Sequence, residues 1–225
     1  MIKEVKPKTQ ILLKKVVAES NNEIATGVFI LRFKRTFDFI AGQVIGICLE
    51  HDGDPRLYSI ASGINDDEIQ ILYNIKPTGK LTPPLAKLKT GDNFYISPPF
   101  GSYSGSAEPA WWIASGTGIA PFLSMFRSGI GAGKVLLHGG RLKEFFYFQD
   151  EFLPVLGNNY IRCCSSESSE GLFTGRLTDY LRQHSNLPNN IKYYLCGNAE
   201  MVVDVRDILI KKGIPFANIV SEIYF

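Results

Sequence analysis

The chain has 225 residues, of which 45% are hydrophobic, 12% aromatic and 20% charged, a composition that excludes a disordered or fibrous protein. Its net charge of +2 is too small to indicate nucleic-acid binding. No uninterrupted apolar run is long enough to span a membrane, and the basic start lacks the apolar core of a signal peptide. A cytoplasmic protein without membrane or nucleic-acid partners is therefore expected. The positive charge gathered in the first 36 residues fits either an acidic partner or a solvated sheet face.

The four cysteines, Cys48, Cys163, Cys164 and Cys196, form no CxxC pair. This spacing argues against a zinc site, a thioredoxin-type pair and an iron–sulfur cluster, so reduced thiols and no metal site are expected. Cys163 and Cys164 lie in an apolar run and are interpreted as core residues.

The first half of the chain, up to about residue 97, has short apolar runs separated by turn residues, which predicts a small antiparallel β-barrel. One helix is expected in the run TPPLAKLK, with Thr82 as its N-cap, Pro83 in the first helical position and Gly91 after its end. The strands are expected at residues 9–17, 26–33, 43–50, 56–62, 68–75 and 93–98.

The second half alternates buried strands with amphipathic helices, which predicts a doubly wound parallel sheet. The turn residues of SPPFGSYSGS predict a linker, so the domains are placed at 1–103 and 104–225. Ligands of such sheets bind beyond the carboxyl ends of the strands. The strands are expected at residues 110–115, 134–140, 160–165, 191–197 and 218–225, and the helices begin near residues 121, 149, 174 and 198.

Three short motifs carry candidate chemistry. The run ASGTGIAPF places two glycines at a strand end before Pro121, where backbone N–H groups can approach a pyrophosphate, although a tight turn without ligand has the same pattern. The run GKLTPPL offers a second phosphate site with Lys80 and the Thr82 hydroxyl, or simple helix capping. Two ligands are the economical inference.

The third motif, RLYS, places Arg56, Tyr58 and Ser59 on a predicted strand. Because side chains alternate along a strand, Arg56 and Tyr58 share one face and Ser59 points to the other. A ring beside a positive charge suits a planar, phosphorylated cofactor, and it is also an ordinary cross-strand pair.

The other aromatic and histidine residues indicate no second catalytic set, since no Ser-His-Asp or metal-ligand spacing accompanies any histidine. His138 is expected to be a hydrogen-bonded histidine inside a strand. Trp111 and Trp112 are expected to pack at the domain junction.

Seven segments in order resemble the ferredoxin-NADP reductase family, most closely the compact bacterial branch of ferredoxin/flavodoxin-NADP reductases. The likeness runs from about residue 10 to the last residue. It implies a β-barrel that holds FAD and an α/β domain that holds the nicotinamide nucleotide, with the two cofactors meeting at the interface. The segments are FIAGQ (39–43), RLYS (56–59), GKLTPPLAKLKTGD (79–92), SGTGIAPFLSM (115–125), GR (175–176), CGNAEMV (196–202) and SEIYF (221–225).

The resemblance assigns roles residue by residue on the flavin side. It implies that the Tyr58 ring lies against one face of the isoalloxazine and that the Tyr224 ring covers the other. Phe225 matches the extra terminal aromatic of the bacterial branch and is expected to pack toward the FAD adenine or the barrel. The residues matched to FAD binding are Arg56, Leu57, Tyr58, Ser59, Lys80, Leu81, Thr82, Tyr224 and Phe225.

On the nucleotide side, Arg141 and Arg176 match two of the three arginines that bind the 2′-phosphate in family members that use NADP. The third position falls in the pair Ser165–Ser166 and carries no arginine. Two guanidinium groups can still hold a phosphate dianion, so NADP is expected to be favoured, with use of NAD left open. The turn residues Gly116, Thr117, Gly118 and Gly197 complete the predicted nucleotide site, and Tyr58, Cys196, Glu222 and Tyr224 are the predicted catalytic residues.

The resemblance implies an enzyme that transfers electrons between NADPH and a one-electron carrier, ferredoxin or flavodoxin, through FAD, and that works as a monomer. One alternative is an NAD(P)H-dependent flavin or quinone reductase. Another is the electron-transfer subunit of a larger dehydrogenase, although family subunits of that kind usually add a cysteine cluster that this sequence lacks.

Overall fold

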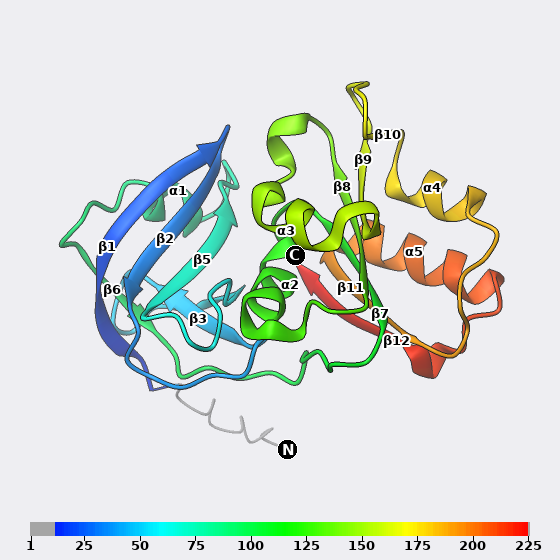
Figure 1. Cartoon of the computed structure of the whole chain (residues 1–225). Coiled ribbons are helices and arrows are strands. Elements are labelled where there is room, and N and C mark those ends of the chain that lie inside the picture. Colours follow the sequence, from blue (N-terminus) through cyan, green and yellow to red (C-terminus); the bar gives the residue numbers. More distant parts are fainter. Residues whose placement is uncertain (1–11, 225) are drawn as a thin grey trace, which may run out of the picture.

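A computed structural model describes residues 12–224, and in it the two halves of the chain form two separate six-stranded sheets that lie side by side (Figure 1). Phe225, to which the sequence assigned a packing role, lies outside the described residues. In the described part of the chain, no helix combines the length and the apolar character needed to cross a membrane. The barrel followed by a parallel α/β sheet is the architecture that the sequence predicted.

The first sheet is antiparallel, with strand order β4-β3-β6-β1-β2-β5. An isolated bridge between Ile60 and Ile71 brings its two edge strands together, so that the sheet curls into a barrel around a core of aliphatic and aromatic side chains. The strands are β1 (Lys14–Ala25), β2 (Val28–Lys34), β3 (Val44–Cys48), β4 (Arg56–Ser59), β5 (Glu68–Asn74) and β6 (Asn93–Ile96), and the helix α1 (Thr82–Leu85) lies between β5 and β6.

The second sheet is parallel, with strand order β10-β9-β8-β7-β11-β12, and helices cover both of its faces (Figure 1). Its central strand β7 is buried from Ala110 to Ala114, as a strand covered on both sides must be. The strands are β7 (Ala110–Ser115), β8 (Lys134–Gly140), β9 (Tyr160–Cys164), β10 (Phe173–Thr174), β11 (Lys192–Asn198) and β12 (Ile219–Tyr224), and the helices are α2 (Ala120–Met125), α3 (Gln149–Leu156), α4 (Leu177–Gln183) and α5 (Ala199–Lys211).

The expected elements differ from the observed ones in three places. Strand β1 runs to Ala25, well past its expected end, because it pairs with β2 through two register irregularities. The helix expected near Thr174 begins at Leu177, since Phe173 and Thr174 form the edge strand β10 beside β9. The helix expected over TPPLAKLK is only the four residues Thr82–Leu85.

The connection between the two sheets, residues 97–109, contains the predicted domain boundary at residues 103 and 104, which stays a prediction. Tyr103 within it is buried, so this connection is packed against the protein at that point. A side chain in place of Gly42 would collide with the Tyr103 carbonyl oxygen. The first sheet therefore holds the connection in close contact.

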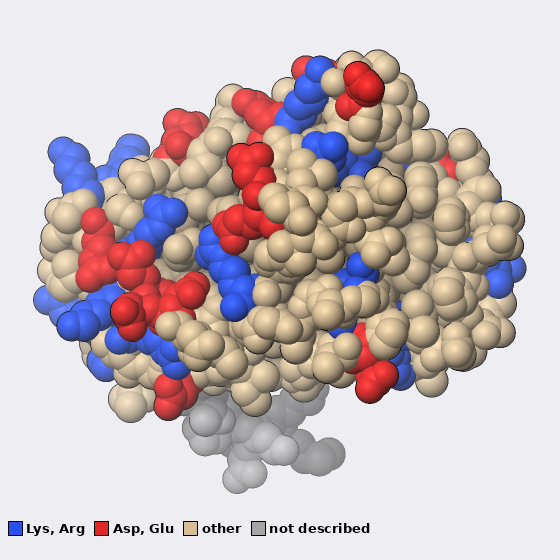
Figure 2. All heavy atoms as spheres, viewed as in Figure 1, with Lys and Arg blue, Asp and Glu red and all other residues tan. Residues whose placement is uncertain are grey.

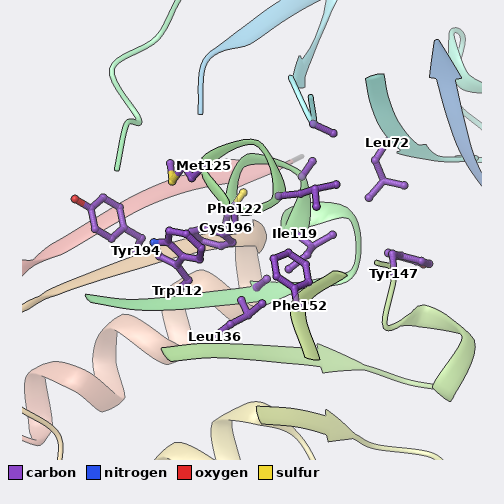
Figure 3. Packing of buried hydrophobic residues seen from close by; sticks show 14 of the residues in the cluster. Leu72, Trp112, Ile119, Phe122, Met125, Leu136, Tyr147, Phe152, Tyr194 and Cys196 are labelled. Atoms are coloured by element: carbon purple, nitrogen blue, oxygen red, sulfur yellow. The ribbon is translucent and has the colours of Figure 1, made fainter. Parts of the chain in front are cut away.

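A shared hydrophobic cluster joins the barrel to the α/β sheet. It contains Leu72 of the barrel together with Trp112, Phe122 and Tyr147 of the second half (Figure 3). The expectation for Trp112 is thus met, but Trp111 points to the opposite face of the sheet and packs against Tyr193, away from the junction.

Arg127, in the turn after α2, is anchored within the second half by Glu151 and contacts the barrel at Gln70. It donates two hydrogen bonds to the carboxylate of Glu151 in α3, at 2.9 and 2.6 Å, and one to Gln70 in β5 at 3.0 Å. Only 19% of the Arg127 side chain is exposed. Ser124 adds a hydrogen bond of 2.7 Å to the carbonyl of Ser62.

We expect Arg127→Ala to lower the free energy of unfolding by about 2–3 kcal/mol, because it leaves a half-buried carboxylate and an amide without their donor. Urea denaturation measures the change. The control is Arg206→Ala, which breaks an exposed pair with Asp207 in one helix and should cost less than about 1 kcal/mol. Equal effects of the two variants would contradict a role for Arg127 in joining the halves.

Candidate functional site

A cleft of about 1120 Å³ separates the barrel from the carboxyl ends of the parallel strands. Strand ends of such a sheet are where ligands bind, and here the barrel supplies the opposite wall. Most of the predicted site residues line this cleft, but Gly118, Ser166, Cys196 and Gly197 do not. Those that do are Arg56, Leu57, Tyr58, Ser59, Lys80, Leu81, Thr82, Gly116, Thr117, Arg141, Ser165, Arg176, Glu222 and Tyr224.

On the barrel side, all four residues of β4 reach the cleft because β4 is the first strand in the order of its sheet. The expected separation of Ser59 from Arg56 and Tyr58 by strand alternation is therefore incomplete. Arg56 is exposed, the Tyr58 ring is half-buried, and Ser59 is buried. Burial raises the pKa of Tyr58 to about 12, so its ring is a neutral surface at physiological pH.

The loop Lys76–Thr82 forms the next part of the barrel wall. The Thr82 hydroxyl accepts a hydrogen bond from the Lys76 N–H at 2.8 Å, and the Gly79 N–H donates to the Lys76 carbonyl at 2.8 Å. Thr82 is thus not the N-cap that the sequence predicted, since Leu81 occupies that position and makes no side-chain cap. The hydroxyl closes the loop and retains its own proton for donation to a ligand.

The glycine turn after β7 is a 3₁₀ turn at Gly116–Ile119 that leads into α2. Gly116 has a positive φ of 54° and no atom near the position of a Cβ, so it faces open space and needs its conformational freedom. Position 118 requires a glycine for a different reason, because a Cβ there would collide with the Cys196 carbonyl oxygen. The sequence assigned both glycines to ligand approach, and for Gly118 the close packing of the turn on β11 is the observed cause.

The two halves are joined inside the cleft by a chain of side-chain hydrogen bonds. The Tyr224 hydroxyl donates to Ser59 Oγ at 2.6 Å, and Ser59 Oγ donates to Glu222 Oε2 at 2.9 Å. The Cys196 thiol faces the Tyr224 hydroxyl from β11, where it is paired in register with Glu222. Residues that are 163 or more positions apart in sequence thus meet at one point.

Burial controls the ionisation of this chain. It raises the pKa of Glu222 above its ordinary value, and the hydrogen bond from Ser59 opposes that change. Burial also raises the pKa of the Cys196 thiol, with the Glu222 carboxyl reinforcing it, and that of the Tyr224 phenol. A neutral thiol is a poor nucleophile, so these residues form a hydrogen-bonding and proton-holding set.

The two arginines predicted for the nucleotide site, Arg141 and Arg176, lie just after β8 and β10. Arg141 and Arg176 are both exposed and both line the cleft. The Ser165 N–H donates to the Gly140 carbonyl at 3.1 Å and the Ser166 N–H to the Arg141 carbonyl at 3.0 Å, which holds the serine pair beside Arg141. Arg176 is fixed at the start of α4, where its N–H donates to Asp179 at 3.2 Å.

Several lining residues were missed by sequence reasoning. Phe145 and Tyr147 come from the loop between β8 and α3, and the aromatic run FFYF was the signal that could have indicated them. Asn198 and Glu200 lie in the segment CGNAEMV, where the sequence assigned neither a role at the site. The Asn198 side chain does cap α5, as its place at the helix start predicted, accepting from the Met201 N–H at 2.9 Å. Asp204 on α5 carries no distinguishing sequence pattern.

His138, expected to be fully hydrogen-bonded, is only partly so. Its Nδ1 lies 3.1 Å from the Tyr160 hydroxyl, but its buried Nε2 has no hydrogen-bond partner among the described residues. Burial lowers the pKa of His138 from 6.5 to about 4. The four cysteines are free and buried, as expected of Cys163 and Cys164.

Comparison with known proteins gives the family. The family described as "Oxidoreductase NAD-binding domain" matches residues 112–207. The flavodoxin/ferredoxin–NADP reductase of Escherichia coli is 30% identical over 197 residues, which cover 75% of this chain and 77% of the relative. The chain belongs to the ferredoxin/flavodoxin-NADP reductase family. It is thus an oxidoreductase, and the family predicted from the seven segments is confirmed.

A solved structure shares the fold of this chain, and a further relative matches its sequence. A ferredoxin NADP+ reductase from Neisseria gonorrhoeae, solved with bound FAD and NADP, superimposes with a TM-score of 0.84 at 20% identity, over 95% of this chain and 99% of that one. The reductase component of propane 2-monooxygenase from Mycolicibacterium goodii is 28% identical over 80% of this chain. The chain spans only 57% of that relative.

The buried histidine predicts a pH dependence of stability in this reductase-family chain. In the unfolded state His138 binds a proton below about pH 6.5, but in the folded state it binds that proton only below about pH 4. Stability from the neutral ring is complete above pH 6.5 and decreases as pH falls. Urea unfolding at pH 7 and pH 4.5 should show that wild type loses about 2 kcal/mol more than His138→Phe. The exposed-histidine control His51→Phe should follow wild type; parallel losses in wild type and His138→Phe would contradict the assignment.

Proposed function

We propose that this protein is a flavoprotein reductase that moves electrons between NADPH and a one-electron carrier, with FAD bound to the barrel wall of the cleft. The observation that carries the proposal is the hydrogen-bonded chain from Tyr224 through Ser59 to Glu222, which joins the RLYS strand to the last parallel strand. It supports the proposal because residues of both predicted binding regions line the same cleft.

The residues of the barrel wall fit a flavin dinucleotide. Tyr58 presents a neutral ring, Arg56 and Lys80 are exposed cations, and Thr82 keeps a hydroxyl proton free for a phosphate oxygen. When bound, FAD would accept one hydride, which carries two electrons, and would release those electrons singly, chemistry that protein side chains do not have. The chain's own part is to hold the ring against Tyr58 and to exclude water from one side.

On the other wall, the nicotinamide must approach the reacting ring from the side on which Tyr224 lies. The Tyr224 hydroxyl is held by Ser59, so nucleotide binding requires that this hydrogen bond breaks. Ser59 keeps its bond to Glu222 during the exchange, because the two contacts use different atoms of the hydroxyl. Tyr224 thus acts as a gate, and Glu222 remains at the reaction point, with Cys196 buried behind the cleft lining.

NADP is the preferred nucleotide of this proposal. The support is the pair of exposed guanidinium groups, Arg141 and Arg176, on one stretch of the cleft. The backbone of Ser166 is hydrogen-bonded to the Arg141 carbonyl, so an arginine placed at position 166 would lie next to Arg141 in the same loop region.

The electron partner is proposed to be ferredoxin or flavodoxin, with the protein acting as a cytoplasmic monomer. Figure 2 shows Lys and Arg side chains at the barrel end of the visible face, mixed with Asp and Glu. This mixture fits a solvated sheet face as well as an acidic partner. The relative from M. goodii is named as the reductase component of propane 2-monooxygenase, so its name indicates an oxygenase partner. Electron transfer to each carrier must therefore be measured separately.

The test is a titration of the purified protein with NADPH and NADH under anaerobic conditions, followed by addition of ferredoxin, flavodoxin or free FMN. A yellow protein whose flavin absorbance is bleached by NADPH and restored by a protein carrier is expected. Restoration by free FMN alone would indicate a flavin reductase. A protein that neither contains nor binds FAD would overturn the proposal.

The first variant tests the flavin site. Arg56→Ala should weaken FAD retention by on the order of 1.5–3 kcal/mol, the free energy of a charge-assisted contact to a phosphate. Equilibrium dialysis against FAD measures it. Arg32→Ala, on β2 outside the cleft lining, should bind FAD as wild type does. A similar loss in both variants would show that net charge, and not the Arg56 contact, decides retention.

The second variant pair tests nucleotide choice. Arg141→Ala combined with Arg176→Ala should raise the KM for NADPH and leave the KM for NADH nearly unchanged, because only NADPH carries the 2′-phosphate. Ser166→Arg should sharpen the preference for NADPH. Steady-state kinetics with both nucleotides measures these effects. Equal damage with NADPH and NADH would mean that the arginines serve the fold.

A further inference from the structure

Three aromatic rings from three strands of the barrel are in contact with one another, and the last of them reaches the cleft. Phe29 of β2 and Tyr73 of β5 are paired directly across the two strands, with ring centroids 5.6 Å apart and an angle of 22° between the rings. Tyr73 also meets Tyr58 of β4, with centroids 6.3 Å apart and an angle of 75°. These are the stacked and edge-to-face arrangements that aromatic pairs favour.

Tyr73, the middle ring, is held by a hydrogen bond as well as by packing. Only 1% of the residue is exposed, and its hydroxyl donates to Asn21 Oδ1 at 2.9 Å. The amide nitrogen of Asn21 donates in turn to the carbonyl of Leu85, the last residue of α1, at 2.9 Å. The Tyr73 ring therefore cannot tilt without breaking a hydrogen bond inside the barrel.

Tyr58, the ring at the cleft, has fewer constraints of its own. It lies on β4, which has four residues and is the first strand in the order of its sheet. The side chain is partly buried against the barrel core and also lines the cleft. Its ring thus has Tyr73 on the barrel side and space for a ligand on the other side. The orientation of the Tyr58 ring depends on the ring behind it.

We propose that Tyr73, anchored by Asn21, is a positioning residue that fixes the orientation of the Tyr58 ring against which the flavin ring is held. The inference rests on the proposed function of the cleft. A contact ring that is already oriented before the ligand arrives saves the free energy of ordering it on binding. The hydroxyl of Tyr73 thereby contributes to flavin binding without touching the flavin.

The test is Tyr73→Phe, which keeps the ring and releases it from Asn21. Titration of the apoprotein with FAD should give a Kd on the order of threefold above that of wild type, since part of the contribution of the aromatic pair is lost. The fluorescence of the bound flavin should increase, because a phenol ring in close contact quenches it and the loosened Tyr58 ring makes that contact less often.

The matched control is Tyr193→Phe, a buried tyrosine of β11 outside the cleft lining. Its hydroxyl donates to the Pro188 carbonyl at 2.7 Å, so its removal should lower the melting temperature and leave the Kd for FAD and the flavin fluorescence unchanged. A purely structural role for Tyr73 would give this same pattern in Tyr73→Phe and would overturn the inference.

A double-mutant cycle shows whether the effect passes through Tyr58. In a Tyr58→Leu background, Tyr73→Phe should change neither the Kd for FAD nor the flavin fluorescence, because the ring that it positions is absent. An undiminished effect would overturn the inference.

A second cycle tests the anchor. Asn21→Ala removes the same hydrogen bond from its acceptor side, so it should raise the flavin fluorescence, and the combination with Tyr73→Phe should raise it no further. Additive increases would overturn the assignment of Asn21. If wild type binds FAD and Tyr73→Phe matches it in Kd and fluorescence, only this inference falls; if wild type does not bind FAD, the proposed function itself has failed.

Discussion

The Ser59 hydroxyl is the single contact on which the arrangement of the site depends. It accepts a hydrogen bond from Tyr224 and donates one to Glu222, so one barrel residue holds two residues of the last parallel strand. Ser59 is itself buried at the edge of the barrel, where its strand can reach the other sheet. A hydroxyl is suited to this position because it can accept and donate at the same time, which neither a carboxylate nor an ammonium group can do.

These hydrogen bonds form only if the two halves are held at a constant distance. The hydrophobic cluster around Trp112 supplies most of that constraint, because it contains side chains from both halves. Arg127 adds a polar link, since its guanidinium bonds to Glu151 of the second half and to Gln70 of the barrel. In the proposed function, the part that moves against this junction is the Tyr224 side chain, which Ser59 holds by one hydrogen bond.

The same burial that holds the halves together determines the charge state of the site. It raises the pKa of the Cys196 thiol, of the Tyr224 phenol and of the Glu222 carboxyl above their ordinary values. The cationic side chains Arg56 and Arg141, which also line the cleft, are exposed to solvent instead. In the proposed function, planar rings would meet the buried phenol rings and phosphates would meet the exposed cations, a division that follows from where desolvation is costly.

The sequence by itself determined the strands, the order of the two domains and the motifs RLYS and SGTG, because periodicity, turn residues and glycine placement are local properties. Only the tertiary structure decided which side chains meet. Gly118 is a glycine because of Cys196, Thr82 bonds to Lys76 instead of capping a helix, and Trp111 faces away from the junction. Ser59 and Glu222 are 163 residues apart, and no local pattern contains the side-chain contact between β4 and β12. Such contacts depend on how whole sheets pack, which a pattern of neighbouring residues does not encode.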